Sequence, residues 1–212
     1  MELATVCVGP AKEVDWRGER VATAIFKGPV ESAAVGPLGL EGDEQADLAV
    51  HGGPDKAVYA YSADHYPWWK ARLPGVELPY GAFGENLTIS GFDEEDACLG
   101  DVYRAGTARL LAIQPRLPCY KLGLRFGDPG MVKAFAQSMR LGIYFRVAEP
   151  GRVRRLDGFE KISEHALRFP VLGLARLYFD PALTREKARP ALEHPALNDN
   201  WRDMLGSRLN KG

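Results

Sequence analysis

Residues 102–113 read Val-Tyr-Arg-Ala-Gly-Thr-Ala-Arg-Leu-Leu-Ala-Ile, and this stretch decides the fold class. Residues typical of β-strands stand on both sides of a short turn at Ala105-Gly106-Thr107. Gly106 has no Cβ and can adopt the positive φ angle that a tight reversal of the chain requires. The stretch therefore predicts a β-hairpin with strands at residues 102–104 and 109–113.

Further strand-like stretches lie on both sides of this hairpin. They are short and separated by turn residues, and they cover residues 3–8, 20–27, 56–61, 86–90, 143–148 and 153–156. Many short strands joined by Gly- and Pro-containing loops favour a barrel or a sandwich. We therefore expect a mainly β fold, interrupted by short helices at residues 63–72 and 130–138.

The last part of the chain has a helical pattern instead. Thr184 and Asn198 are N-cap candidates, and the predicted helices cover residues 170–179, 184–193 and 198–209. Three helices this short cannot bury a core alone, so they must dock on the β part or on another subunit. We expect a β-barrel domain over residues 1–158, a three-helix segment over residues 159–212, and a homodimer.

Composition narrows the possible partners. The chain has 27 Lys and Arg against 28 Asp and Glu, a net charge of -1, so no global attraction to nucleic acid or to an anionic membrane is expected. No window approaches the ~20 apolar residues of a membrane-spanning helix, and the N-terminal stretch lacks a signal-peptide pattern. A cytoplasmic protein without nucleic-acid or membrane partners is expected. Three widely spaced cysteines predict neither a disulfide framework nor a zinc knuckle.

The segment Gln114-Pro-Arg-Leu-Pro-Cys119-Tyr-Lys121 has the densest chemistry. Its two prolines directly follow a predicted strand and hold Cys119 in a rigid loop. Arg116 and Lys121 are close to Cys119 in the chain, and their charges would favour the thiolate, which is the form that binds metals or attacks electrophiles. The alternative is a buried, inert cysteine beside two solvated bases. Cys7 and Cys98 are expected to be structural.

Two glycine-containing segments are further candidates. In His51-Gly52-Gly53-Pro54 the paired glycines could aim successive N–H groups at a phosphate, although the same pattern also makes an ordinary turn. In the segment at residues 81–86, Glu85 and Asn86 could present hydrogen-bonding groups to a heterocycle, or could form a bulge with surface polar residues. Neither a dinucleotide fingerprint nor a Walker A sequence occurs.

The order of these segments resembles that of the YiiM-like MOSC-domain proteins. The resemblance covers residues from about 25 to 156, and it rests on Gly-Leu-Glu-Gly-Asp at 39–43, His-Gly-Gly-Pro-Asp-Lys-Ala-Val at 51–58, Gly-Ala-Phe-Gly-Glu-Asn at 81–86, Leu-Gly-Asp at 99–101 and the Cys119 segment. The stretch at residues 195–202 is similar to that subfamily's three-helix appendage. The sequence departs from the family pattern at Leu-Gly-Ile-Tyr, residues 141–144.

The resemblance implies a MOSC-type β-barrel that binds the molybdenum cofactor (molybdopterin), with Cys119 as the catalytic metal ligand or sulfur carrier. It implies reduction of N-hydroxylated bases or related N-hydroxy compounds, with a flavoprotein as the electron donor. The cofactor would be held by the phosphate-binding group of Arg116, Lys121, His51, Gly52 and Gly53, together with Glu85 and Asn86 at the pterin edge. The alternatives are a sulfur carrier with a Cys119 persulfide and a cofactor-binding module without turnover.

Overall fold

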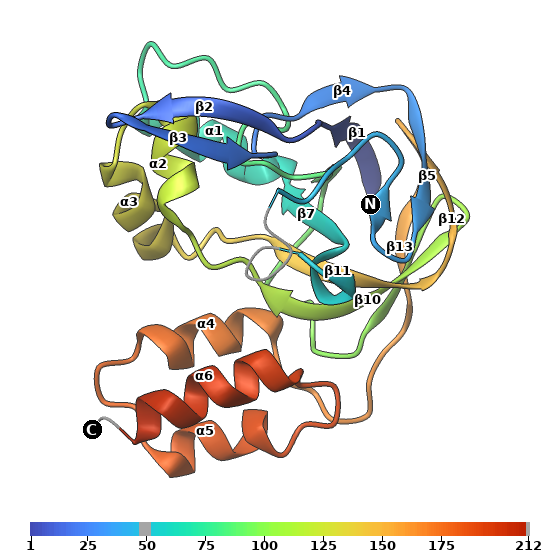
Figure 1. Cartoon of the computed structure of the whole chain (residues 1–212). Coiled ribbons are helices and arrows are strands. Elements are labelled where there is room, and N and C mark those ends of the chain that lie inside the picture. The colour runs from blue at the N-terminus through green and yellow to red at the C-terminus, as the bar shows by residue number, and fades with distance from the viewer. Residues whose placement is uncertain (47–51, 211–212) are drawn as a thin grey trace.

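The computed structural model describes residues 1–46 and 52–210, and Figure 1 shows a β-rich body with a helical tail. The strands are β1 (Glu2–Val8), β2 (Lys12–Trp16), β3 (Glu19–Thr23), β4 (Gly28–Val30), β5 (Ser32–Gly36), β6 (Gly39–Leu40), β7 (Val58–Ser62), β8 (Leu87–Ser90), β9 (Val102–Ala105), β10 (Ala108–Pro115), β11 (Ile143–Glu149), β12 (Gly151–Arg154) and β13 (Phe159–Ser163). The helices are η1 (Pro54–Lys56), η2 (Ala63–His65), α1 (Tyr66–Arg72), α2 (Tyr120–Phe126), α3 (Gly130–Ser138), α4 (Val171–Phe179), α5 (Arg185–Leu192) and α6 (Asp199–Leu209).

Eight strands form the main sheet in the order β13-β9-β10-β11-β7-β8-β1-β4. The mainly β fold is confirmed, but the strand order of the described residues does not close into a barrel, so the expected barrel is corrected to a strongly curved open sheet. The sheet curls far enough for β1 to meet the chain before β13: Leu3 N donates to Asp157 O at 2.9 Å, and Phe159 N donates to Met1 O at 2.9 Å. Smaller sheets, β12-β5-β6 and β2-β3, lie beside it.

The hairpin predicted around Gly106 is confirmed and lies inside the main sheet. Ala105 pairs with Ala108, and Gly106 has a φ of +54°. β10 lies between β9 and β11, and Ala108, Leu110 and Ala112 alternate into the core. β10 ends at Pro115, so the chain passes directly from the sheet into the loop before Cys119.

Some predicted strand boundaries were wrong. The strand expected over residues 20–27 ends at Thr23, since β3 pairs only with β2 in a hairpin whose register ends there. The strand expected from residue 56 begins at Val58, because Pro54 opens the short helix η1, where the missing N–H of a proline costs nothing. β7 then runs into η2 and α1, with Ser62 as the predicted cap.

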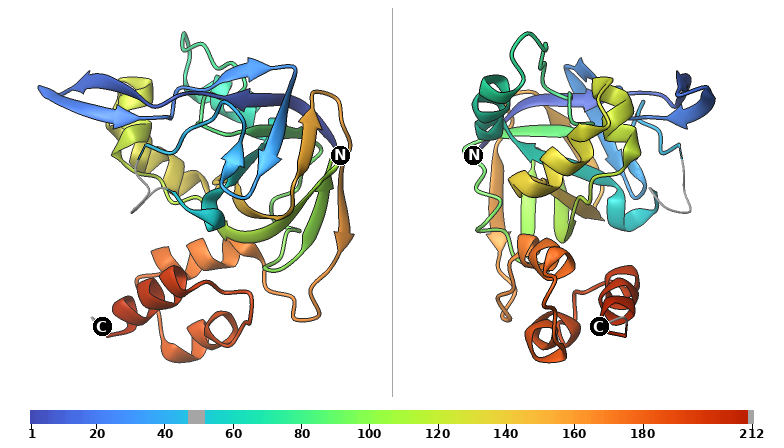
Figure 2. Two further views of the ribbon diagram at one scale, coloured as in Figure 1. Left: turned by 45° about the vertical axis from the view of Figure 1, so that its right-hand side comes forward. Right: turned by 90° about the vertical axis from the view of Figure 1, so that its left-hand side faces the viewer.

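The three tail helices are confirmed, with their predicted caps. Thr184 Oγ1 accepts a hydrogen bond from Lys187 N at 3.3 Å, and Asn198 Oδ1 accepts one from Trp201 N at 3.0 Å. The tail docks on the sheet beside β10 (Figure 2), and Val171, Leu174, Trp201 and Leu205 belong to the same buried cluster as the sheet. The homodimer stays a prediction. The division at 158/159 also stays a prediction, and β13, which follows it, pairs with β9 of the main sheet.

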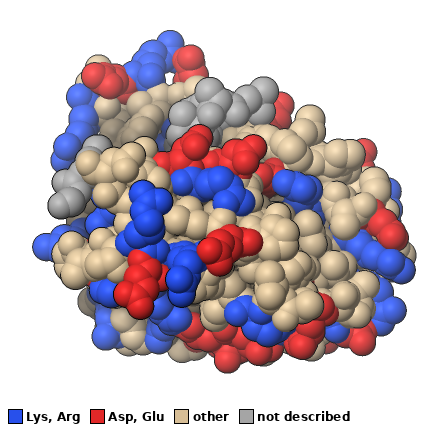
Figure 3. All heavy atoms as spheres, turned by 90° about the horizontal axis from the view of Figure 1, so that it is seen from below, with Lys and Arg blue, Asp and Glu red and all other residues tan. Residues whose placement is uncertain are grey.

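The outer face of the tail carries charges of both signs. Seen from below in Figure 3, Lys and Arg side chains alternate with Asp and Glu side chains across uncharged surface. Neither sign covers this face continuously, in keeping with the net charge of -1. Within residues 1–46 and 52–210, no helix has the length and apolar character needed to cross a membrane.

Gly142 lies next to the candidate site. Its φ of +69° is a backbone conformation that glycine adopts far more readily than other residues. A Cβ at this position would lie 2.5 Å from Tyr59 Cε2 and 2.6 Å from Ala60 O. Its N–H donates to Glu94 Oε2 at 2.9 Å, and its carbonyl accepts from Arg116 N at 3.2 Å.

We expect Gly142→Ala to lower the free energy of unfolding by about 1–3 kcal/mol, measured by urea denaturation, because the sheet must shift to admit the methyl group. Gly18→Ala is the matched control, since Gly18 also has a positive φ, +85°, but no atom lies within 4 Å of the place its added methyl group would take. Equal losses in the two variants would show that the close approach to Tyr59 is not what requires glycine at this position.

Candidate functional site

Cys119 lies at the junction between β10 and α2. Pro115 ends β10, and Cys119 itself is extended, with φ −126° and ψ 172°, as the residue before the helix begins. Its carbonyl accepts a hydrogen bond from Leu122 N at 2.9 Å, which starts the first turn of α2. The side chain is half-buried and faces a cavity rather than the core.

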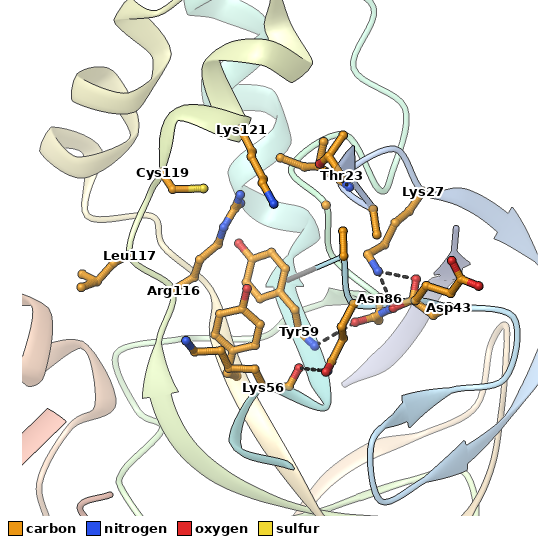
Figure 4. Close-up of a pocket in the computed structure, with 17 residues that line it drawn as sticks. Thr23, Lys27, Asp43, Lys56, Tyr59, Asn86, Arg116, Leu117, Cys119 and Lys121 are labelled. Atoms are coloured by element: carbon orange, nitrogen blue, oxygen red, sulfur yellow. Dashed lines mark hydrogen bonds and ion pairs between the residues drawn. The ribbon is translucent and has the colours of Figure 1, made fainter. Parts of the chain in front are cut away.

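The cavity beside Cys119 has a volume of about 110 Å³ and is lined by several of the site residues predicted from the sequence. Figure 4 shows Arg116 and Lys121 directed toward the same space as the Cys119 sulfur, with Asn86 at its far side. These side chains come from the Cys119 loop, from α2 and from the residue directly before β8. The structure therefore brings together four of the residues that the sequence singled out.

Arg116 is the most unusual group in this cavity. It is only 6% exposed, and within the described part of the chain no carboxylate lies at salt-bridge distance from it. Its guanidinium donates to the carbonyl of Phe83 and lies 5.1 Å from the ring centroid of Tyr59 and 5.2 Å from that of Phe135.

The surroundings of Arg116 keep it charged despite its burial. Burial by itself lowers the pKa of Arg116, but interactions with Tyr59, Tyr144 and Cys119 outweigh it and raise the pKa above its usual value. A charged guanidinium without a carboxylate at salt-bridge distance among the described residues can take a ligand's anionic group as its ion-pair partner. The site therefore favours an anionic ligand.

A second cation, Lys27, is already neutralised. Burial lowers the pKa of Lys27, while its ion pair with Asp43 opposes that shift. Asp43 also accepts hydrogen bonds from Gly9 N at 2.9 Å and from Asn86 Nδ2 at 2.8 Å. Lys27 and Asp43 together form a rigid, nearly neutral wall of the cavity.

Asn86 is held by the same network. Its Oδ1 accepts from Tyr59 N at 3.0 Å, and its Nδ2 donates to Cys7 O at 3.3 Å as well as to Asp43. Both donors of the amide are thus used within the chain. Asn86 shapes the cavity wall, and only the second lone pair of its oxygen remains for a ligand.

Glu85 does not reach the cavity. It is fully buried and accepts hydrogen bonds from Gly81 N at 2.9 Å, Phe83 N at 3.1 Å, Thr88 Oγ1 at 2.9 Å and the Tyr66 hydroxyl. The structure therefore places Glu85 behind the site, where it fixes the loop whose Phe83 carbonyl receives Arg116.

Gly52 and Gly53 lie on a neighbouring cavity of about 490 Å³, next to α6. Gly53 N donates to Gln45 Oε1 at 2.9 Å, so one of the backbone donors expected to hold phosphate is occupied. His51 lies outside the described residues. The two cavities share Cys119, Leu117, Tyr144 and Lys56 as lining residues, so Cys119 lies where they meet.

Sequence reasoning missed the tyrosines around Arg116 and the helix after Cys119. Tyr59 and Tyr144 pair across β7 and β11, with ring centroids 5.0 Å apart. Nothing in the sequence shows that these distant strands are neighbours. For α2 a signal did exist: Gly127 ends it in the left-handed conformation, at a position where glycine commonly follows a helix.

The three cysteines are expected to differ in reactivity. Burial, with help from Glu85, raises the pKa of Cys7 to about 12, and burial also raises the pKa of Cys98. At pH 8 iodoacetamide should therefore label Cys119 about tenfold or more faster than the other two, as measured by peptide mass spectrometry. Equal labelling of Cys7 in the folded protein would contradict the structure.

The raised pKa of Cys7 also has a consequence for stability. Between pH 9 and about 12 the unfolded thiol ionises while the folded one stays protonated, so the stability contributed by this group is lost as the pH rises through that window. A Cys7→Ala variant, followed by denaturation between pH 8 and 11, should show a weaker alkaline loss than the unmodified protein.

Comparison with known protein families gives two matches. The MOSC domain profile matches residues 47–159, and the profile of the YiiM-like, 3-alpha helix domain matches residues 170–212. The first match contains the Cys119 loop and both strands that carry the tyrosines. The second contains all three tail helices.

Individual proteins show the same likeness. The "Uncharacterized protein YflK" of Bacillus subtilis is 40% identical over 196 residues, which are 92% of this chain and 88% of the relative. A protein of Gibberella moniliformis named "Reductase" is 36% identical over 76% of this chain, which spans only 29% of that longer relative. The crystal structure of YiiM from Geobacillus stearothermophilus is 32% identical, with 98% of each chain covered and a TM-score of 0.81.

Proposed function

This chain belongs to the MOSC-domain family and carries the YiiM-like three-helix domain, and on that premise we propose that it binds the molybdenum cofactor beside Cys119 and reduces N-hydroxylated compounds. One observation carries the proposal. A half-buried thiol and a buried guanidinium line the same cavity, and no carboxylate of the described residues lies at salt-bridge distance from the guanidinium. This pair of groups offers a soft metal ligand and an anion-binding group side by side.

The residues present fit such a cofactor. A thiolate suits molybdenum in a sulfur-rich environment. Arg116 would bind a phosphate group, since that anion would supply the missing partner of the buried guanidinium, and Lys121 would add a second positive charge at the cavity. The cavity of about 110 Å³ suits the phosphate group of such a cofactor.

The chain's own residues would position the cofactor and the substrate, and they would not themselves perform the redox chemistry. When bound, the cofactor supplies the two-electron redox chemistry. Two electrons enter as the N–O bond breaks, one proton goes to the nitrogen and a second to the departing hydroxyl, and the products are the N–H compound and water. We propose that a reduced flavoprotein supplies the electrons. The name of the Gibberella relative, a reductase, supports a reductive activity.

The proposal is tested by elemental analysis of the protein expressed with excess molybdate. We expect about one molybdenum per chain, together with reduction of an N-hydroxylated base when a reduced flavoprotein is present. Protein that folds but contains no molybdenum would overturn the proposal. Bound molybdenum without turnover on any hydroxylamine would favour a cofactor-binding module instead.

We also propose that the protein acts in the cytoplasm as a homodimer. The near-neutral charge and the lack of a membrane-spanning helix in the described residues are compatible with this. Light scattering at micromolar concentration is the measurement for the dimer. The mass of a single chain would contradict it.

A further inference from the structure

The larger cavity beside Cys119 lies between the sheet and the helical tail. Its walls come from the turn before η1, from the loop before Cys119 and from the first half of α6. Its volume of about 490 Å³ falls within the range of roughly 300–1,000 Å³ that is typical of small-molecule sites. The tail therefore takes part in forming a ligand-sized space.

This cavity reaches the same sulfur as the anion-binding cavity, but from the other side. Cys119, Leu117 and Tyr144 line both spaces. A molecule in the larger cavity can therefore approach the Cys119 centre while Arg116 and Lys121, which line only the smaller one, hold an anionic group. The smaller cavity would then hold the anionic group of the cofactor, and the larger cavity would hold the substrate.

The principal polar groups of the larger cavity are paired within the chain. Asp55 accepts hydrogen bonds from Arg146 Nε at 2.8 Å and from Asn198 Nδ2 at 3.0 Å. The Gln114 amide accepts from Trp201 Nε1 at 2.7 Å and donates to Asp55 O at 3.0 Å. The remaining walls include Leu117, Pro118 and the side chains of α6. Apart from Lys56, which lines both cavities, such a lining favours a flat, uncharged ring over an ion.

The α6 wall has one fixed side chain and one adaptable side chain. Trp201 is fully buried and tied to Gln114, so it anchors the helix against β10. Met204, one turn further on, is half-buried and lines the cavity. Methionine is unbranched and polarizable, so it can pack against flat rings of different shapes.

We infer that the larger cavity is the substrate site and that Met204 determines which ring sizes it accepts. The inference rests on the proposed function for the reaction but assigns the substrate position to a wall built by the helical tail. The occupant it predicts is a flat, uncharged, ring-containing N-hydroxylated compound. Its ring contacts Met204, and its N–OH group points toward Cys119.

The test compares Met204→Trp, which fills the cavity, with Ser207→Trp, which adds the same bulk to an exposed position of α6 outside the cavity. Adenine serves as an uncharged two-ring probe in calorimetry, and turnover is measured with N-hydroxylated adenine and with N-methylhydroxylamine. We expect Met204→Trp to weaken adenine binding and to lower kcat/KM for the two-ring substrate about tenfold or more. Turnover of N-methylhydroxylamine should fall less than turnover of the two-ring substrate, and the molybdenum content should match that of Ser207→Trp.

Met204→Ala gives the opposite change, since it widens the cavity, and it should raise kcat/KM for a three-ring N-hydroxylated amine relative to the two-ring substrate. Met204→Trp and Ser207→Trp proteins that bind adenine equally well would overturn the inference. Adenine binding does not require molybdenum, so its loss in Met204→Trp would support the substrate site even if no variant reduced any hydroxylamine. Failure of every variant to reduce any hydroxylamine would count against the proposed function but not against the substrate site.

Discussion

Replacing Cys119 with serine is expected to remove nearly all molybdenum from the protein while leaving its fold intact. The side chain lies at the boundary of two cavities rather than in either buried cluster, so the substitution costs little packing. A serine hydroxyl is a hard, weakly acidic donor and a poor replacement for a soft thiolate. Molybdenum per chain should fall about tenfold or more, and reduction of N-hydroxylated substrates should fall with it.

Cys98→Ser provides the matched control, because Cys98 is buried near Asp101 and lines neither cavity. That variant should keep its molybdenum. Thermal unfolding of all three proteins shows whether a loss of metal comes from misfolding. Molybdenum content that is the same in Cys119→Ser as in the unmodified protein would mean that another group holds the metal.

Replacing Arg116 with methionine should abolish anion binding without unfolding the protein. The guanidinium is buried with no carboxylate at salt-bridge distance among the described residues, so its removal breaks no ion pair there. Methionine has similar length and can fill much of the same space, although it leaves the Phe83 carbonyl without this donor. The free energy of unfolding without ligand should therefore change by no more than about 2 kcal/mol.

The effect on binding is expected to be far larger. Pyrophosphate should raise the unfolding temperature of the unmodified protein, because a ligand that binds only the folded state stabilises it. In Arg116→Met its affinity should fall about a hundredfold, the usual size of the loss when one partner of a buried charge pair is removed. Arg125→Met is the control: Arg125 lies over the Phe26 ring, at 5.2 Å from its centroid, and lines neither cavity. Equal pyrophosphate shifts in Arg116→Met and Arg125→Met would show that Arg116 does not bind the anion.

The features that the sequence predicted well are local. The hairpin around Gly106 and the helix starts at Thr184 and Asn198 depend on residues within one turn of each other, so the pattern of neighbours was enough. Arg116 and Lys121 could be placed near Cys119 because they are three and two residues from it in a loop that Pro115 and Pro118 restrict. The strand limit at Thr23 could not be placed, because it depends on the pairing of β3 with β2.

The sequence by itself determined a mainly β body, a capped three-helix tail and a cysteine held in a rigid basic loop. Only the tertiary structure decided that Arg116 is buried with no carboxylate of residues 1–46 and 52–210 at salt-bridge distance, that the hydrogen bonds of Glu85 are made behind the cavity wall, and that α6 lines a second cavity. The reason is physical. Burial and polar pairing depend on groups far apart in the chain. Asn198 and Asp55, for example, are 143 positions apart, yet Asn198 Nδ2 donates to Asp55 Oδ2 at 3.0 Å. Local preferences carry no information about such pairs.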